Sequence, residues 1–462
     1  MRHVGLAAIA LAAAATTVAA QEVSLSRTGS GARAAGMGNA FIAVSDDGTA
    51  ASWNPAGLSQ LLKPEFSLVH STGHRNRYFE GFRTRDESAA FTALATASST
   101  ADIEFASGAV PFRLGGKPVT LQVGWRRLYQ LAAQVRGETR RVAASPTARA
   151  DSTIAIDATD NGSINLWSLA GAVGFTNRLS VGWSLDFYRG EWEERGNFNE
   201  DPGILGPTDF LSTVQANRLN GHSLSLGLLL AYPSVKVGLV YHGALRGDFS
   251  QTFSVRSNLV ESLDLSSAAE LRFPRSIGAG VAWRPRPLLR LALDVTYDEW
   301  TQFLIDETGG SPDDALSALD GLPPELSAAR DTVSLNVGME KLFPVKGAYV
   351  PLRLGVAYEP QGGRDSLLRD DLTFHVLAAG TGYNTNSVKL DVALEYRWGS
   401  VRTSQDFSVV YQVDGTEEFG LPPRPEAQGT IRLRQWRVKV SVIYRVTNTG
   451  KLGDFLKKVF GS

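Results

Sequence analysis

The side chains with most capacity for chemistry in this chain are charged residues that alternate with apolar ones along segments of about ten residues. Eight are cations by this alternation: Arg126, Lys236, Arg290, Arg353, Lys389, Arg397, Arg437 and Lys439. Five are acids on the same faces: Asp186, Asp294, Asp298, Asp391 and Glu395. Buried charges have to be paired. Most of these residues are therefore expected to neutralise one another inside the fold, and the alternative is that one or two cations bind a ligand carboxylate.

Other kinds of site chemistry find no support in the sequence. The chain has no Cys, its six His residues lack metal-ligand spacing, and no Gly-x-Ser-x-Gly motif is present. His222 and His242 lack a matching Ser and carboxylate arrangement. We therefore expect no catalytic residues, no metal and no cofactor, and an outer-membrane enzyme such as a lipid hydrolase is the least favoured function. The 46 basic and 47 acidic residues also disfavour a nucleic-acid partner.

The segments that carry these charges show the period of two that is typical of β-strands. In 388–398, Val388, Leu390 and Val392 begin one apolar face, while Lys389 and Asp391 begin the polar one. Segments 290–298 and 435–446 follow the same pattern. This pattern predicts strands with one apolar and one polar face, in a soluble sandwich or in a membrane barrel.

Connection lengths and aromatic positions favour the barrel. Short turns near 115–116, 176–177, 233–234, 285–287, 343–348 and 384–386 alternate with long polar connections at about 130–162, 191–220, 244–273, 299–330, 360–372 and 399–430. Aromatic residues recur near the short turns (Phe112, Phe175, Tyr232, Trp283, Phe343, Tyr383) and near the long connections (Tyr129, Phe187, Tyr241, Tyr297, Tyr358, Tyr396). Short turns on one side, long loops on the other and two aromatic belts are typical of outer-membrane barrels.

The segments can be counted as strands. One strand near 64–72 is followed by six hairpins, namely 103–113 with 118–129, 164–175 with 178–189, 221–232 with 234–243, 275–284 with 288–298, 331–341 with 350–359 and 373–383 with 387–398, and then by a last strand at 431–446. The prediction is an all-β, 14-stranded antiparallel transmembrane β-barrel (63–447) with both termini on the periplasmic side. An extra hairpin in 73–102 or 399–413 would instead give 16 strands.

The two ends of the chain carry further signals. Residues 1–20 resemble a signal peptide, with Arg2 and His3 before an apolar run that ends at Val18-Ala19-Ala20. The run is too short for a membrane anchor, which is the alternative. Residues 448–462 show an amphipathic helical pattern, and the alternative is a frayed tail. Export without Cys suits the bacterial outer membrane.

Residues 21–62 precede the first strand and are rich in small side chains. We expect short helices at 32–44 and 49–53, separated by a turn at 46–48, and we expect Asn54 to cap a further turn that begins at Pro55. A 14-stranded barrel leaves a lumen wide enough to hold such a segment. The prediction is a small helical hatch inside the lumen, and the alternative is an extension outside the barrel.

The stretch GARAAGMGNAFIAVSDDGTAASWNPAGLS (31–59) resembles the N-terminal hatch of the FadL/OmpP1/TodX family of outer-membrane transport proteins. Asn54, Pro55 and Ala56 match the Asn-Pro-Ala motif of that hatch. Segment 275–303, with its Trp300-x-x-Phe303 element, and segment 373–398 resemble two hairpins of the family.

The resemblance implies a 14-stranded barrel that carries long-chain fatty acids or other hydrophobic compounds passively across the outer membrane. In this mechanism the hatch rearranges and a kinked strand gives a lateral exit into the lipid. The expected partners are hydrophobic small molecules and outer-membrane lipid, with the protein acting as a monomer. A related barrel family with a similar hatch acts in protein secretion, so a binding or adaptor protein is the alternative function.

Several residues are candidates for roles in such transport. Asn54, Pro55 and Ala56 would form the contact between hatch and wall, if they are not a plain helix cap. Met37, Phe41, Ile42 and Trp53 would form the pocket floor, if they do not simply pack the hatch against the barrel. Gly108 and Pro111 would kink the wall, if they do not mark the end of a strand.

Overall fold

The computed structural model describes residues 28–84, 89–90, 94–145, 148–201, 208–258, 261–307, 315–319, 322–327, 329–362, 372–405, 410–411, 419–420 and 427–447. The predicted signal peptide (1–20) and C-terminal tail (448–462) lie outside these residues. None of the described helices is long and apolar enough to cross a bilayer.

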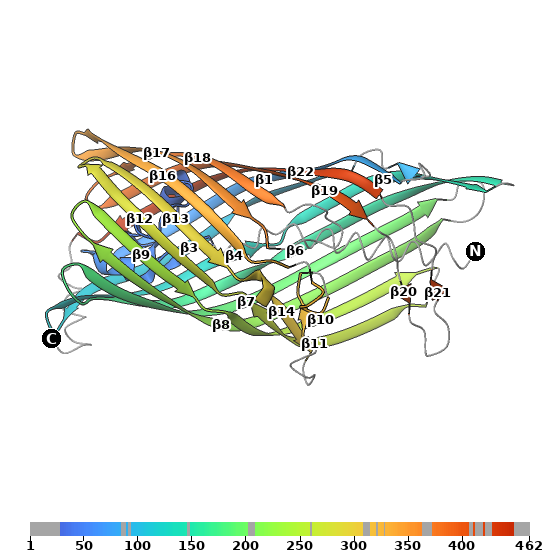
Figure 1. Cartoon of the computed structure of the whole chain (residues 1–462), viewed down its shortest axis with the longest axis horizontal. Helices are drawn as coiled ribbons and strands as arrows, with labels where there is room; N and C mark the ends of the chain where they lie inside the picture. The colour runs from blue at the N-terminus through green and yellow to red at the C-terminus, as the bar shows by residue number, and fades with distance from the viewer. Residues whose placement is uncertain are drawn as a thin grey trace.

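Fourteen antiparallel strands form a closed ring (Figure 1). In ring order they are β1 (Glu65–Thr84), β3 (Leu94–Leu114), β4 (Lys117–Gln130), β6 (Ala148–Gly174), β7 (Leu179–Asp201), β8 (Asp209–Ala231), β9 (Val235–His242), β12 (Ser276–Arg286), β13 (Leu289–Asp298), β16 (Thr332–Val345), β17 (Ala348–Pro360), β18 (Thr373–Asn384), β19 (Val388–Gln405) and β22 (Ala427–Arg445). The ring closes because β22 pairs with β1 from Glu65↔Arg445 onward. The predicted 14-stranded barrel is confirmed.

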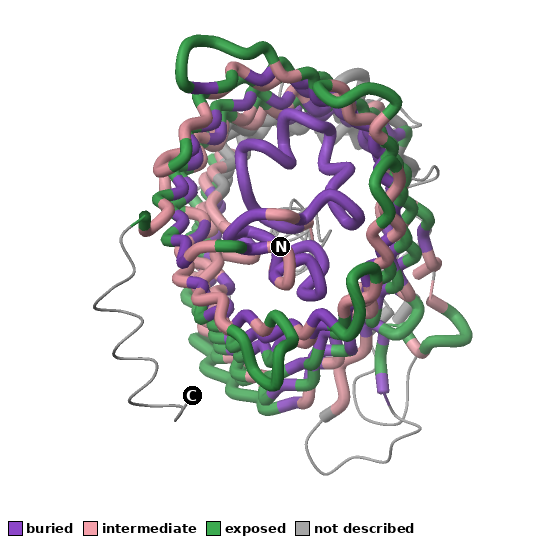
Figure 2. The backbone as a smooth tube through the Cα atoms, turned by 90° about the vertical axis from the view of Figure 1, so that its left-hand side faces the viewer, coloured by how far each residue is buried: buried purple, intermediate pink, exposed green. Residues whose placement is uncertain are grey.

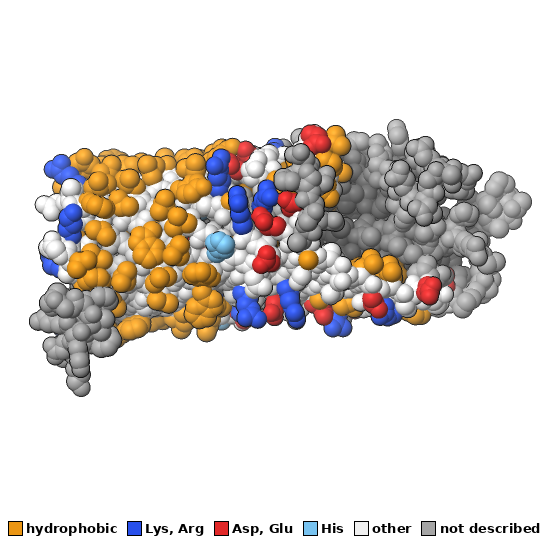
Figure 3. Space-filling view, turned by 90° about the horizontal axis from the view of Figure 1, so that it is seen from below, with side chains coloured by type: hydrophobic (Ala, Val, Ile, Leu, Met, Phe, Trp, Pro, Cys, Tyr) orange, Lys and Arg blue, Asp and Glu red, His pale blue; other side chains and the backbone are white. Residues whose placement is uncertain are grey.

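Alternating side chains give the ring its two faces. On β17, Leu352, Leu354 and Val356 are exposed on the outside, whereas Arg353 between them is fully buried. The outer residues form an apolar band on the face of the wall that Figure 3 shows. A continuous exposed apolar patch is typical of a surface that is covered by lipid or by a partner. An outward-facing apolar band around the strands is the surface that a membrane barrel presents to the bilayer.

Much of the sequence predicted as long connections forms β-strands. The ring strands β6, β7 and β8 are long and extend past the shorter ring strands at the end opposite the short turns. Four more strands extend the sheet at the same end: β5 (Ala133–Ser145), β10 (Leu245–Ser257), β11 (Leu263–Phe273) and β14 (Leu304–Glu307). The prediction of polar loops at 130–162, 191–220 and 244–273 was therefore wrong in structure, although these segments do connect barrel strands. Short pieces β2 (Ala89–Ala90), β15 (Leu316–Ser317), β20 (Val410–Tyr411), β21 (Phe419–Gly420) and η4 (Trp300–Gln302) complete the elements after the hatch.

Most aromatic residues predicted at the belts face outward, but Tyr129 does not. Phe175, Tyr232, Trp283, Phe343 and Tyr383 are exposed near the short turns, and Phe187, Tyr297 and Tyr358 are exposed near the other edge. Tyr129 is buried inside the barrel. A register shift between Arg127 and Tyr129 inserts Leu128 as an extra residue in β4, and this reverses the alternation on which the prediction depended.

Residues 28–61 lie inside the ring, where they are almost entirely buried (Figure 2). We call this segment the hatch. It contains α2 (Ala32–Gly36), η1 (Ala50–Ser52) and η2 (Pro55–Gln60). The predicted helix at 32–44 was too long. Gly38 and Asn39 have φ values of 60° and 65°, a left-handed conformation that a right-handed helix cannot contain.

Candidate ligand-binding and gating site

The hatch rests on glycine residues of the wall. Three pairs of glycines face each other across neighbouring strands: Gly182 with Gly227, Gly238 with Gly280, and Gly338 with Gly355. A Cβ atom at Gly227 would lie 2.1 Å from Oδ1 of Asn54, and one at Gly355 would lie 2.0 Å from the backbone nitrogen of Gly38. The missing side chains therefore allow the backbone of the hatch to approach the wall closely.

Asn54 connects the hatch to β8 and also caps η2. Its side-chain amide donates to the carbonyl oxygens of Leu228 at 3.1 Å and Ile42 at 3.2 Å, while Oδ1 accepts from the backbone N–H of Ala56 at 3.1 Å. Pro55 occupies the first position of η2, where its missing N–H leaves no donor unsatisfied. The predicted cap is confirmed, and the same side chain contacts the wall.

Asp294 of β13 holds a second part of the hatch. Its Oδ2 accepts the backbone N–H groups of Phe41 at 2.5 Å and Ile42 at 2.7 Å. These bonds satisfy two backbone donors of the hatch that would otherwise be buried without a partner. The side chain of Asp294 is 2% exposed, so water hardly competes for these bonds.

A buried network of charges ties the hatch to the wall on the other side. Arg33 of α2 bonds Glu340 of β16 through two nitrogen atoms, at 2.8 and 2.9 Å, and it also contacts Asp46 at 2.5 Å and Asp47 at 3.2 Å. Glu340 receives further bonds from Arg290 at 3.1 Å and Arg353 at 2.8 Å. The network therefore joins three cations of hatch and wall around one acid of the wall.

The electrostatic field of this network acts on the acids of the hatch. Burial by itself would raise the pKa of Asp46, but the combined charges of Arg33, Arg290 and two nearby lysine residues outweigh burial and hold that pKa well below its usual range. Asp46 therefore stays ionised and keeps its ion pairs at neutral pH.

The eight cations predicted on the inner face all contact partners there. Arg290 and Arg353 belong to the network described above. The other contacts are Arg126 with the carbonyl of Thr28, Lys236 with Gln60, Lys389 with Asp47, Arg397 with Glu359, Arg437 with Glu395, and Lys439 with Glu104. Mutual neutralisation inside the barrel, the favoured interpretation, accounts for most of them.

The four residues predicted to form the pocket floor divide into two pairs. Ile42 and Trp53 line a small cavity of about 60 Å³ between the hatch and β12, β13 and β16. Met37 and Phe41 are fully buried in a cluster that joins the hatch to Ala282 and Ala292 of the wall, and Phe41 packs edge-on against Trp53 with ring centroids 5.8 Å apart.

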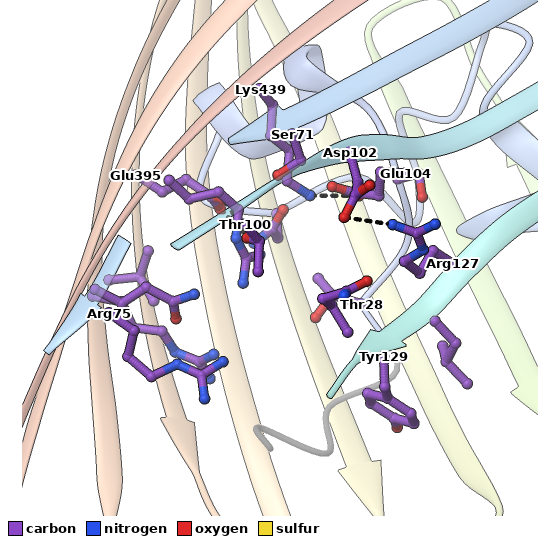
Figure 4. A pocket seen from close by; sticks show the side chains of 18 of the residues that line it. Thr28, Ser71, Arg75, Thr100, Asp102, Glu104, Arg127, Tyr129, Glu395 and Lys439 are labelled. Atoms are coloured by element: carbon purple, nitrogen blue, oxygen red, sulfur yellow. Dashed lines mark hydrogen bonds and ion pairs between the residues drawn. The ribbon is translucent and has the colours of Figure 1, made fainter. Parts of the chain in front are cut away.

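A larger cavity of about 170 Å³ lies between the hatch, β1, β3, β4 and the last strands of the ring (Figure 4). Thr28, Gly29, Ser30 and Asn39 form its side toward the hatch. Seven Arg or Lys residues and four Asp or Glu residues line it, which gives the lining a formal charge of +3 (7 − 4): Arg75, Arg126, Arg127, Arg397, Arg434, Arg437, Lys439, Asp102, Glu104, Glu359 and Glu395. The buried Nε atoms of Arg126, Arg127 and Arg397 have no hydrogen-bond partner among the described residues.

An apolar cluster lies beside this cavity. Tyr129, Ile164, Leu166, Tyr188, Leu219, Leu245, Leu271, Phe273, Trp300 and Phe303 pack together there. Leu128 and Tyr129 belong to the lining of the cavity as well, so the two sites meet at β4. Trp300 and Phe303 of the predicted Trp-x-x-Phe element contact each other with ring centroids 6.0 Å apart.

The wall next to the charged cavity is interrupted between β3 and β4. These strands pair from Leu114↔Lys117 to Phe105↔Arg126, and β3 next pairs on that side with β5 from Thr96. No described ladder pair joins residues 97–104 of β3 to β4 or β5. Asp102 and Arg127 bridge the interruption with an ion pair at 2.7 Å (Figure 4).

The two candidates for a wall kink lie beside this interruption, in the regularly paired part of β3. Gly108 pairs with Val123 and Pro111 with Thr120 in an unbroken ladder. The irregularity lies instead at Glu104, where the register against β1 shifts between Val69 and His70. Glu104 carries no Gly or Pro signal, and its side chain is bonded to Lys439 inside the barrel.

Sequence reasoning did not assign Arg33, Asp46, Asp47 and Glu340 to the site. Asp46 and Asp47 are adjacent acids in a segment that is otherwise nearly free of charge. This pattern could have indicated the network, because buried acids have to be paired with cations. Among the described residues, no group of His and acidic side chains is arranged to hold a metal ion.

Comparisons with known proteins agree with this architecture. The model of the family described as outer membrane protein transport protein (OMPP1/FadL/TodX) matches residues 6–420. No curated protein matches the chain.

Solved structures share the fold. A FadL homologue from Pseudomonas aeruginosa superposes with a TM-score of 0.61 at 13% identity, with 90% of this chain and 98% of that chain covered. The toluene transporter TodX of P. putida gives 0.58 at 13% identity over 92% and 100% of the two chains. The toluene transporter TbuX of Ralstonia pickettii gives 0.55 at 15% identity over 90% and 98%. The chain belongs to the OMPP1/FadL/TodX family of transport proteins of the bacterial outer membrane.

Proposed function

We propose that this barrel carries long-chain fatty acids or other hydrophobic compounds passively across the outer membrane, with a preference for compounds that bear an acidic head group. The observation that supports this preference is the contact between the apolar cluster and the cavity of net positive charge, which meet at Tyr129. An alkyl chain and a carboxylate need these two environments side by side.

The path that we propose begins among the apolar side chains at the loop end. The acyl chain enters the cluster around Phe273 and Trp300. The carboxylate binds at Arg126, which has a buried unpartnered Nε and lies three positions from Tyr129 of the cluster. The hatch closes the direct route below. The interruption between β3 and β4 then offers a lateral exit, since an alkyl chain gains about 0.8 kcal/mol per CH₂ group when it leaves water.

In this proposal the plug domain spans residues 21–62 and includes the hatch segment described above, and residues 63–447 form the barrel. Asn54, Pro55 and Ala56 fix the hatch to the wall. Ile42 and Trp53 form part of the floor of the small cavity, and Met37 and Phe41 pack the hatch against the wall. A single chain suffices, because the ring closes with its own strands. The neighbours titled toluene transporters suggest neutral aromatic hydrocarbons as the competing substrate class.

Substrate uptake by a variant at Arg126 separates these classes. Cells that lack other fatty-acid transporters would express the native barrel or Arg126→Gln and take up radiolabelled oleate or toluene. Loss of a charged hydrogen bond lowers oleate uptake by about tenfold and leaves toluene uptake unchanged. The matched control is Arg189→Gln, since Arg189 is highly exposed and lies outside the cavity lining.

The outcomes test separately whether Arg126 binds the carboxylate of the substrate and whether the barrel transports hydrophobic compounds. Equal losses of oleate and toluene uptake in Arg126→Gln would remove Arg126 as a carboxylate ligand. A native barrel that speeds uptake of neither compound would contradict the transport function for both classes.

A further inference from the structure

The short turns of the barrel have a charge pattern that transport does not use. They comprise residues 113–117, 175–178, 232–234, 284–288, 341–347 and 384–387, and we call them the rim. Four of the six turns contain Arg or Lys, and none contains Asp or Glu. The whole chain has 46 basic and 47 acidic residues, so the absence of acids from the rim is a local segregation of charge.

The cations of the rim are exposed. Arg113, Lys117, Arg178, Arg286, Lys341 and Lys346 all have exposed side chains. Figure 3 shows Arg and Lys side chains at this edge of the apolar band, on the face in view. Their charge is therefore available to a partner outside the protein.

Three of these cations lie over aromatic rings that belong to the outer surface. Lys117 lies 5.1 Å from the ring centroid of Phe175, Arg178 4.9 Å from that of Tyr232, and Lys341 5.1 Å from that of Phe343. Each ring is between 42% and 49% exposed on the outer face of the wall. Such rings sit at the level of the lipid head groups, so they place the cations at that level as well.

We propose that the rim is a binding surface for the anionic head groups of phospholipids in the periplasmic leaflet. Short turns lie on the periplasmic side of outer-membrane barrels. Cations at an anionic lipid surface strengthen membrane association, and they act within a Debye length of the phosphates. Lys117, Arg178 and Lys341 are the principal ligands, because the rings beneath them keep their charges at the depth of the phosphate groups.

The position of the cations favours lipid over an acidic protein of the periplasm. A soluble partner would meet charges directed to the aqueous mouth of the barrel. The three cations instead lie against rings of the outer wall, which is the surface covered by lipid.

The test measures lipid selectivity of the full barrel reconstituted in vesicles of phosphatidylcholine. Spin-labelled phosphatidylglycerol or phosphatidylcholine is added in trace amounts, and the motionally restricted fraction of each probe gives its relative association with the protein. The native barrel is expected to prefer phosphatidylglycerol, and high salt is expected to weaken the preference. The variant Lys117→Gln/Arg178→Gln/Lys341→Gln is expected to lower the preference at least about fivefold.

A matched control carries Arg189→Gln/Arg218→Gln/Arg246→Gln, three exposed cations toward the loop end. It should retain most of the preference. Equal association of the two lipids with the native barrel would overturn the proposal, and so would an equal loss in the control and the rim variant. Binding of soluble polyglutamate to the native rim without any lipid preference would assign the rim to an acidic protein instead. The difference in gel mobility between unheated and heated samples verifies that each variant is folded.

Discussion

At the scale of single residues, the contact between hatch and wall depends on glycine residues of the wall, which have no side chain. Gly227 of β8 lies against Asn54. A Cβ atom at Gly227 would lie 2.1 Å from Oδ1 of Asn54 and 2.9 Å from the backbone nitrogen of Ala56, so an added methyl group has no room there. Charged residues of the wall attract attention in a sequence, but the glycines opposite the hatch decide how closely it can approach.

Gly227→Ala is therefore expected to displace the hatch and to raise the single-channel conductance of the barrel in planar bilayers severalfold. Gly73→Ala is the control, because its Cβ atom would meet its nearest atom, Oγ1 of Thr100, at an ordinary 3.4 Å. A Gly227→Ala channel as closed as the native one would show that the hatch tolerates the added methyl group.

The residue scale also shows what alternation can and cannot predict. The alternation of apolar and polar residues predicted Arg353 and Asp294 on the inner face, and both are buried there. It failed at Tyr129, because a single inserted residue, Leu128, shifts the register of β4. A β-bulge of this kind leaves no Gly or Pro signal in the sequence, since it is fixed by the neighbouring strands.

At the scale of elements, the hatch and β16 are joined through Glu340, which accepts bonds from Arg33, Arg290 and Arg353. Removing one member of a buried charge cluster leaves its partners uncompensated, at a typical cost of about 3–5 kcal/mol. The junction between hatch and wall should therefore be sensitive to single substitutions and less sensitive to paired ones.

Glu340→Gln is expected to lower the thermal unfolding midpoint and to increase conductance, whereas Arg33→Gln/Glu340→Gln should partly reverse both effects. A double-mutant cycle on the unfolding free energy would measure the coupling, with Arg189→Gln as a surface control. Additive effects of the two substitutions would contradict the direct Arg33–Glu340 bond.

The hatch also shows where local sequence signals are reliable. The cap at Asn54 and the start of η2 at Pro55 were predicted from residue types alone, because capping needs only neighbouring residues. The helix at 32–44 was not, since Gly38 turns in a left-handed conformation where its backbone meets Val356 of the wall. That contact is made by residues more than 300 positions apart and leaves no local pattern.

At the scale of the whole molecule, the strand number and closure followed from period-two segments and turn spacing. The strands beyond the ring did not; in β10, for example, the exposed positions Arg246, Asp248 and Ser250 are polar, as they would be in a loop. The charged cavity and the apolar cluster were also out of reach, since each gathers side chains from strands that are distant in the chain. The inward cations were predicted, but those with an unpartnered buried donor, Arg126, Arg353 and Arg397, could be identified only from the structure.

In the proposed transport path, hydrophobic substrate leaves the barrel sideways between β3 and β4. The chain has no Cys, so Asp102→Cys/Arg127→Cys can be joined specifically across the interruption with a reducible thiol cross-linker. The control is Val110→Cys/Leu121→Cys, which joins the same two strands where their ladder is continuous.

The decisive measurement is the uptake of radiolabelled oleate by cells carrying each pair, before cross-linking, after it, and after reduction. Cross-linking Asp102→Cys/Arg127→Cys is predicted to abolish barrel-dependent uptake, reduction to restore it, and the control pair to be unaffected at every stage. Full uptake through the cross-linked interruption would contradict the lateral exit and would require substrate to pass the hatch instead.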